Sequence, residues 1–498
     1  MKIEIQILPE PMLEFGGGMR GESPKQTLPK AGPFLVGPGE GIVTMPLGLI
    51  GPKSEIPKVV DWFEKMKRLL VSNESNALRY PRFPGIEATF RTRFEFVPRF
   101  VQPLGRELDL ALAQPNLHHR FDDLLKLYTD AVSALCSDAG PRCIIVCFPE
   151  EVAALSIENR ALSMVERRRL ERLKDDEHQE QLSLFDQTED RVKVEEIMPR
   201  VDELLVRYFH RAFKARCMGL PNAIPTQVIR TQTYSPPEGK ERQSEATRAW
   251  NLGVALLYKT GNIPWRPADL DEQTCFAGIS FHHLKKRGSS LMYSSVAHAF
   301  SNSVEPFILK GAPIPHQQTW RKQPYLKPEQ AAEIARLLID GYAHRTGSPP
   351  NRLVIHKTSQ FQPDEERAFV DATKSSVPNT SLVWMRPTGF RLLRRGVQEP
   401  FRGTLCRVGG ERSFLFTTGY VPWWEEYPGP HIPAPLEIGA DDVEARSREI
   451  LALTKMNWNT ADGIGRFPIT LAFARRVGMI MAELDEDALP NPSYRFYM

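Results

Sequence analysis

The sequence predicts an α/β protein in which helices cover sheets of largely buried strands. Short apolar runs bounded by proline, such as PRCIIVCFPEEV at 141–152, are typical of buried parallel strands. Between residues 120 and 265, such runs alternate with stretches of helical periodicity. From residue 266 onward, several strand runs come first and two helices close the chain. These three observations together favour two large α/β units.

Composition restricts the classes of function that fit the chain. A length of 498 residues is enough for two large domains or three smaller ones at about 150 residues each. The net charge is only +3, so a nucleic-acid site must come from local clustering of charge. The six cysteines lack metal-ligand spacing, which favours reduced, buried thiols in a cytoplasmic protein. We expect no signal peptide and no membrane span.

The first 105 residues are rich in glycine and proline, and we expect them to form an N-terminal segment that packs on the remainder. Strand-like patterns occur at 3–8 and 94–97, and a helical pattern at 59–70. The glycines at 16–18 are not followed by a lysine and a hydroxyl residue. A turn is therefore favoured over a phosphate-binding loop.

Residues 106–262 are predicted to form a parallel α/β domain. The expected elements are helices at 121–135, 202–219 and 244–262, and strands at 142–148 and 224–230. The stretch 166–199 carries charges of both signs, and we interpret it as an exposed helical insertion.

Residues 263–498 are predicted to form a ribonuclease-H-like domain, because mixed strands come first and helices later. The expected elements are strands at 275–281, 352–356, 382–385 and 414–417, and helices at 328–346, 441–453 and 469–484. Ser280 lies near the carboxyl end of the strand expected at 275–281. A nuclease built on a mixed sheet needs carboxylates there to hold divalent metal ions.

One group of polar residues is the strongest candidate for a binding site. His210 and Lys214 stand four residues apart on a predicted helix, so their side chains share a face. Gln227 lies on the next predicted strand, and Lys259 lies in the last turn of the following helix. Two ammonium groups beside an imidazole and an amide suit a terminal phosphate. A solvated basic helix face is the alternative that these residues alone leave open.

The order of these segments resembles the Argonaute family. The run from FHRAFK through PTQVI to WNLGVALLYKTGNIPW and TCFAGISF is similar to the passage from a MID domain into a PIWI domain. EPMLEFGGG and GPF near the start, RLVIHK, and LTKMNWNT with FPITLAFARRVG extend the resemblance over nearly the whole chain. It implies a Rossmann-like MID domain at 106–262 and a ribonuclease-H-like PIWI domain at 263–498. The length and the lack of PAZ-like sequence point to the short prokaryotic type.

The resemblance implies roles for the candidate residues. His210, Lys214, Gln227 and Lys259 would grip the 5′ phosphate of a guide strand. The carboxylate of Met498 would enter the same pocket and, with Gln227, hold a Mg²⁺ ion at that phosphate. The closing residues NPSYRFYM are short and aromatic, which suits insertion, and a frayed tail is the alternative.

Three positions differ from the metal-binding acids of the slicing members. Ser280 and Thr358 stand where those proteins carry aspartate, and Arg475 stands where they carry aspartate or histidine. Serine and threonine are poor Mg²⁺ ligands, and an arginine would repel the cation. Glu305 is a candidate for a fourth, mobile carboxylate, but one acid cannot hold two metal ions. The resemblance therefore implies no catalytic residues and no slicing.

The resemblance also implies partners. We expect a guide RNA, a complementary single-stranded DNA target, and a second protein that carries an APAZ region with a TIR, sirtuin-like or nuclease effector. Binding of invading plasmid or phage DNA would switch that effector on. Two alternatives stay open, namely an active guide-dependent nuclease with a non-standard metal site and a scaffold protein.

Overall fold

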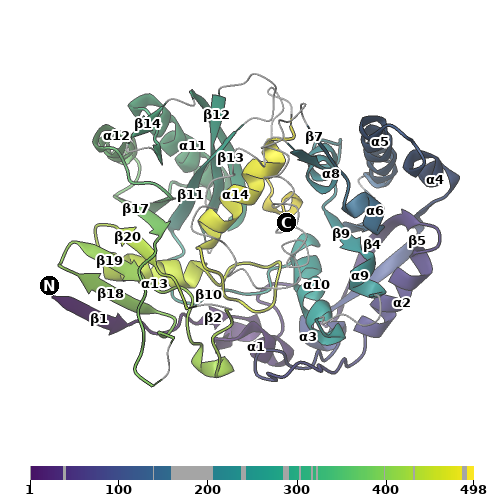
Figure 1. Cartoon of the computed structure of the whole chain (residues 1–498), viewed down its shortest axis with the longest axis horizontal. Coiled ribbons are helices and arrows are strands. Elements are labelled where there is room, and N and C mark those ends of the chain that lie inside the picture. The colour runs from purple at the N-terminus through teal and green to yellow at the C-terminus, as the bar shows by residue number, and fades with distance from the viewer. Residues whose placement is uncertain are drawn as a thin grey trace.

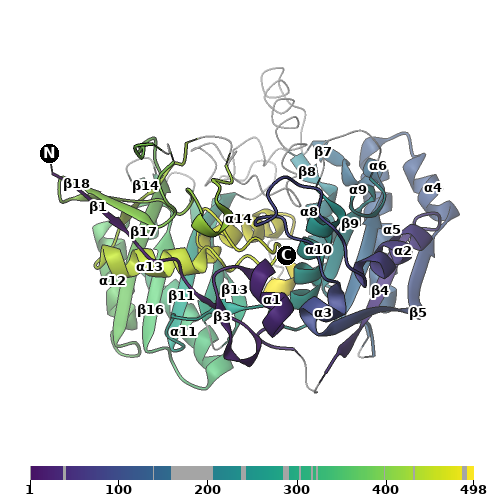
Figure 2. The same ribbon diagram turned by 90° about the horizontal axis from the view of Figure 1, so that it is seen from below.

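The chain forms two lobes, each built on its own sheet (Figure 1). The computed structural model describes residues 2–36, 41–137, 139–158, 206–236, 243–283, 291–301, 304–315, 318–320, 323–396, 399–429, 432–484 and 491–498. In both views the N-terminus lies at the outer end of one lobe and the C-terminus lies between the lobes (Figures 1 and 2). The predicted insertion at 166–199 lies outside the described residues.

The first lobe contains a parallel sheet in the order β5-β4-β6-β9. Its strands are β4 (Val43–Pro52), β5 (Thr92–Leu104), β6 (Cys143–Phe148) and β9 (Thr226–Arg230). Its main helices are α2 (Ile56–Met66), α5 (Leu117–Leu135), α8 (Phe209–Met218) and α10 (Glu245–Lys259). Every residue of β6 is buried, and its side chains alternate between two hydrophobic cores. Burial on both faces explains the uninterrupted apolar run.

The second lobe contains a nine-stranded mixed sheet in the order β1-β18-β19-β20-β17-β16-β11-β12-β13. Its strands are β1 (Ile3–Ile7), β11 (Thr274–His283), β12 (Leu291–Ser301), β13 (Val304–Pro315), β16 (Arg352–Lys357), β17 (Asn379–Pro387), β18 (Thr404–Val408), β19 (Arg412–Leu415) and β20 (Leu436–Gly439). Its helices are α11 (Pro328–Thr346), α12 (Pro363–Thr373), α13 (Val443–Leu453) and α14 (Ile469–Met481). The parallel strands β11, β16 and β17 form its centre, with α11 and α12 on one face and α13 and α14 on the other.

The structure confirms most of the predicted elements and corrects one of them. The helix expected at 328–346 has those bounds, and the predicted strands 142–148 and 352–356 each agree within one residue. The helix expected from 202 begins only at Phe209, because Val206–Tyr208 pairs with Ser156–Glu158 as a short antiparallel ribbon. All six cysteines are free, and all except Cys136 are buried, as predicted. Among the described residues, no helix is both long and apolar enough to cross a bilayer.

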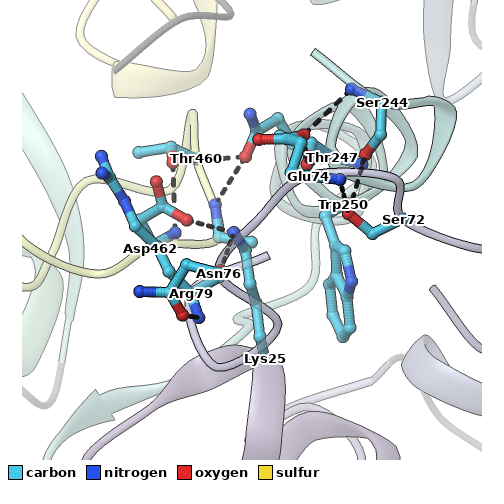
Figure 3. Close-up of polar contacts among 12 residues, drawn as sticks. Lys25, Ser72, Glu74, Asn76, Arg79, Ser244, Thr247, Trp250, Thr460 and Asp462 are labelled. Carbon is cyan, nitrogen blue, oxygen red and sulfur yellow. Dashed lines mark hydrogen bonds and ion pairs between the residues drawn. The ribbon is translucent and has the colours of Figure 1, made fainter. Parts of the chain in front are cut away.

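A buried polar network joins the N-terminal segment to both lobes (Figure 3). Lys25, in helix α1 (Pro24–Ala31), forms an ion pair with Asp462 and donates to the carbonyl oxygen of Arg79 at 3.0 Å. Asn251 of α10 accepts from the backbone amide of Ala461 at 3.0 Å. The loop that contains Asp462 is thereby tied to α1 and to α10. Polar contacts of this junction therefore cross from one lobe to the other.

Candidate nucleic-acid interface

The four residues predicted to form a phosphate site come from α8, β9 and α10, which meet at the boundary between the lobes. Lys214 is 3% exposed, and its Nζ donates to the carbonyl oxygen of Thr226 at 2.5 Å. The same Nζ donates to a main-chain oxygen of Met498 at 2.9 Å. The last residue thus lies against Lys214. Met498 is itself buried, which excludes the frayed-tail alternative.

Lys259 approaches the same point from the last turn of α10 and is 1% exposed. Its Nζ donates to the Thr226 carbonyl oxygen at 3.1 Å and to Oε1 of Gln227 at 2.6 Å. Two ammonium groups therefore share a single carbonyl oxygen. We call Lys214, Lys259 and the Thr226 carbonyl the lysine pair site.

The closing tail is held in place by aromatic packing. The ring centroid of Tyr494 lies 4.5 Å from the ring centroid of Phe473 on α14 and 5.7 Å from that of Tyr258 on α10. Arg207, in strand β8 (Val206–Tyr208), pairs with the buried carboxylate of Glu483 at 3.0 Å, which ties the end of α14 to the first lobe. These contacts place Met498 against Lys214 rather than in solvent.

Burial dominates the electrostatics of the lysine pair site. Burial lowers the pKa of Lys214 to about 8 and lowers the pKa of Lys259 well below its usual 10.5. The pKa of His210 lies well below 6.5, first because of burial and then because Lys214, Arg230 and Lys259 repel a further charge. Within the described residues, no carboxylate side chain pairs with either lysine. With the carboxylate of Met498 beside Lys214, as the resemblance implies, one negative charge offsets part of the two ammonium charges. A phosphate at this point would stabilise the charged forms of both lysines further.

Two members of this site could not be found from residue spacing. Arg230, at the end of β9, contributes to the low pKa of His210, and burial lowers its own pKa. It stands three residues after Gln227, and residues three apart in a strand point to opposite faces, so this spacing does not predict that the two lie together. The Thr226 carbonyl oxygen is a backbone group, so the identity of the side chain does not reveal it.

Two of the positions that the resemblance relates to metal-binding acids lie at the same end of the second sheet. β11 and β16 are adjacent and parallel, with Ile279 opposite Lys357, so Ser280 and Thr358 follow at the same end of the sheet. Helix α14 crosses β11 at Gly278, where an added Cβ would lie 2.0 Å from the Thr470 carbonyl oxygen. The side chains of Glu305 and Arg475 lie outside the described residues.

An ion pair lies beside this corner of the sheet. Lys357, the last residue of β16, is fully buried and donates to both carboxylate oxygens of Glu365 at 2.5 and 2.7 Å. Glu365 also accepts from the backbone amides of Leu326 and Gln362, each at 3.1 Å. The carboxylate is thus committed to internal donors. In the described part of the chain, no three His, Cys, Asp or Glu residues are grouped as metal ligands.

Comparison with known proteins bears on the fold alone. No family model matches the chain, and no curated protein sequence does. The Argonaute of Clostridium butyricum, solved with a guide DNA and a target DNA, is 16% identical over 99% of this chain, with a TM-score of 0.63. Drosophila Piwi is 12% identical over 99% of the chain, with a TM-score of 0.58. The Argonaute of A. aeolicus is 12% identical over 98%, with a TM-score of 0.53.

The chain spans about half the length of these proteins, 54% of the first and 56% and 55% of the others. The match covers both lobes, since it includes nearly every residue of the chain. It confirms the predicted α/β class with a MID-like first lobe and a PIWI-like second lobe. The chain therefore has an Argonaute-like fold.

Proposed function

We propose that the chain binds a guide strand by its 5′ phosphate and uses that guide to recognise a complementary strand. The observation that supports this most directly is the pair of buried lysines whose ammonium groups donate to one shared carbonyl oxygen. Two ammonium groups give strong, charge-assisted contacts to a phosphate. Base pairing then supplies sequence specificity, which the protein itself does not need to encode.

We propose a guide RNA and a single-stranded DNA target. The similar structure from Clostridium butyricum holds a guide DNA with a target DNA, and another similar structure, of the protein Aa-Ago, has an externally bound siRNA. The experiment is to purify the chain from its native cell and sequence the nucleic acid that comes with it. Short RNAs with 5′ phosphates are expected. Recovery of no defined short strand would instead favour a scaffold role.

The affinity for a 5′-phosphorylated guide is expected to fall as pH rises above 8. The pKa of Lys214 is lowered to about 8 in the free pocket, and a bound phosphate would raise it. Binding then takes up a proton. For each proton taken up, the affinity falls about tenfold with every unit by which the pH rises. The second ionisation of the phosphate, near pH 6, lies below this range. Titration calorimetry in buffers of different ionisation enthalpy measures the proton uptake.

The control for this pH dependence is the same guide with a 5′ hydroxyl. Its affinity is expected to change little between pH 8 and 10, because it places no charge in the lysine pair site. Parallel pH profiles for the two guides would show that Lys214 does not face the phosphate.

We propose further that the chain does not cut the strand it recognises. Ser280 and Thr358 offer hydroxyl groups where cleavage would need carboxylates, and the neighbouring Glu365 is occupied by Lys357. A guide-loaded preparation is expected to bind a matched target and leave it intact with Mg²⁺ or Mn²⁺. Cleavage at one defined phosphate opposite the guide, abolished by Glu305→Ala, would establish the alternative of an active nuclease.

The Mg²⁺ ion at the guide phosphate stays a prediction. The two protein oxygens proposed to hold it, Oε1 of Gln227 and the main-chain oxygen of Met498, accept hydrogen bonds from Lys259 and Lys214. A divalent ion would therefore share these oxygens with two ammonium groups, which would repel it. If the ion is required, guide affinity will fall sharply in EDTA and recover with added Mg²⁺.

A guided binder that does not cut acts only through another component. We propose an APAZ-type partner with a TIR, sirtuin-like or nuclease effector, bound one to one and activated by invading DNA. Activation requires a surface that differs between the empty and the target-filled forms. Co-expression with the neighbouring gene, followed by mass measurement and an effector assay, tests this. Effector output is expected only with guide and matched target together, and full target affinity without any companion would contradict the proposal.

A further inference from the structure

The outer edge of the second lobe carries an exposed apolar strand. β1 forms one end of the nine-stranded sheet and, among the described strands, pairs only with β18. Ile3, Ile5 and Ile7 are 51%, 55% and 57% exposed. An edge strand of this kind is a template for pairing with another strand, and proteins normally cover or charge such edges.

The backbone groups of the same three isoleucines point outward. β1 and β18 are antiparallel without a bulge, and the amide of Leu8 donates to Gly403 while Lys2 accepts from Gly409. Hydrogen-bonded positions alternate in an antiparallel pair, so the even-numbered residues of β1 face β18. The N–H and C=O groups of Ile3, Ile5 and Ile7 therefore lie along the free edge.

The other face of β1 is polar and already engaged. Glu4 forms an ion pair with Lys2 at 2.6 Å, and the side chain of Gln6 hydrogen-bonds Glu444 of α13. The isoleucines thus lie on the face opposite α13, on the same side as Cys406, their neighbour across the β1–β18 pair. That face is where an additional strand would bury apolar surface.

The strand is complementary to itself. If a second copy of β1 runs antiparallel with Ile5 opposite Ile5, then Ile3 lies opposite Ile7 and Glu4 lies opposite Gln6. All three outward-facing residues then pair with isoleucine, and no like charges meet. A shift of two residues leaves one isoleucine of each copy unpaired, and in one direction it places Glu4 against Glu4, which is unfavourable.

We propose that two copies of this chain pair through β1 in this register and join their nine-stranded sheets into one continuous sheet. β1 lies at the outer end of the molecule, away from the C-terminus and the first lobe, so a second copy approaches an open side (Figures 1 and 2). A five-residue strand buries less surface than a stable interface needs. The dimer is therefore expected to be weak and to form only as the protein concentration rises. This association is independent of the proposed guide binding.

Register-specific cross-linking tests the proposal on the full chain. A hydrogen-bonded antiparallel pair has Cα atoms about 5.5 Å apart, within the range of a disulfide. Oxidised Ile5→Cys is expected to give a covalent dimer on a non-reducing gel. Ile3→Cys mixed with Ile7→Cys is expected to give one as well, whereas either variant alone gives little. The native cysteines contribute little background because five of the six are buried.

The matched control is Leu110→Cys, which puts a thiol at a 63% exposed apolar position on another surface. Equal cross-linking of Leu110→Cys and Ile5→Cys would overturn the proposal, as would Ile3→Cys alone reacting as well as the mixture. Sedimentation velocity gives a second measurement. Ile5→Lys is expected to stay monomeric at concentrations where the unchanged chain dimerises, and a chain that stays monomeric throughout would also overturn it.

Discussion

Replacing Lys214 with alanine is expected to weaken binding of a 5′-phosphorylated guide by about tenfold or more. The ammonium group is buried, lies beside Lys259, and donates to the Thr226 carbonyl oxygen and to a main-chain oxygen of Met498. A phosphate would make a charge-assisted contact with this buried ammonium group, and salt screens such a contact poorly. A guide with a 5′ hydroxyl loses much less. Fluorescence anisotropy with the two guides measures the difference.

Two controls separate a lost contact from a damaged fold. Lys126→Ala removes an exposed lysine that pairs with Asp130 on α5. It is expected to leave the affinities for the 5′-phosphorylated and the 5′-hydroxyl guide unchanged. Lys259→Met removes a buried ammonium group whose pKa burial lowers. The ligand-free variant should melt at no lower a temperature than the parent, but it should lose the preference for a 5′-phosphorylated guide. If Lys214→Ala weakened binding of both guides equally, the guide phosphate would not bind in this pocket.

The sequence predicted the central strands well because burial on both faces leaves a continuous apolar run. β6 and β16 are examples, and the proline and charged residues that bound them are plain in the sequence. β4 was not predicted, although it lies at the centre of the first sheet. Its sequence, VTMPLGLIGP, contains two prolines and two glycines, which locally indicate a loop. Pairing with β5 and β6 on either side overrides that local preference.

The candidate site was predicted less completely than the fold. Spacing on a helix placed His210 and Lys214 together, and the order of the predicted elements suggested Gln227 and Lys259 as neighbours. These residues alone left a solvated helix face open as the alternative, and the resemblance favoured the phosphate site. The approach of Met498 depends on aromatic packing around Tyr494, which no local pattern encodes. The same holds for Lys357 and Glu365, eight residues apart, whose contact requires α12 to fold back against the end of β16.

Replacing Glu365 with alanine is expected to cost about 3–5 kcal/mol of folding stability, because it leaves Lys357 buried without a counter-ion. Both side chains are fully buried, and burial already lowers the pKa of Lys357. The carboxylate also satisfies two backbone amides at the start of α12 and before α11. Urea denaturation measures the loss as a lower midpoint at an unchanged slope.

The matched control is Glu366→Ala, which removes the exposed carboxylate next in the chain and should change stability by less than about 0.5 kcal/mol. The double variant Lys357→Met with Glu365→Gln is expected to recover most of the loss, since it removes the buried charge and keeps an acceptor for the amides. If Glu365→Ala were no less stable than Glu366→Ala, the carboxylate would not be committed to Lys357. It would then be available beside Thr358 as a metal ligand, and the proposal that the chain cannot cut would lose one of its supports.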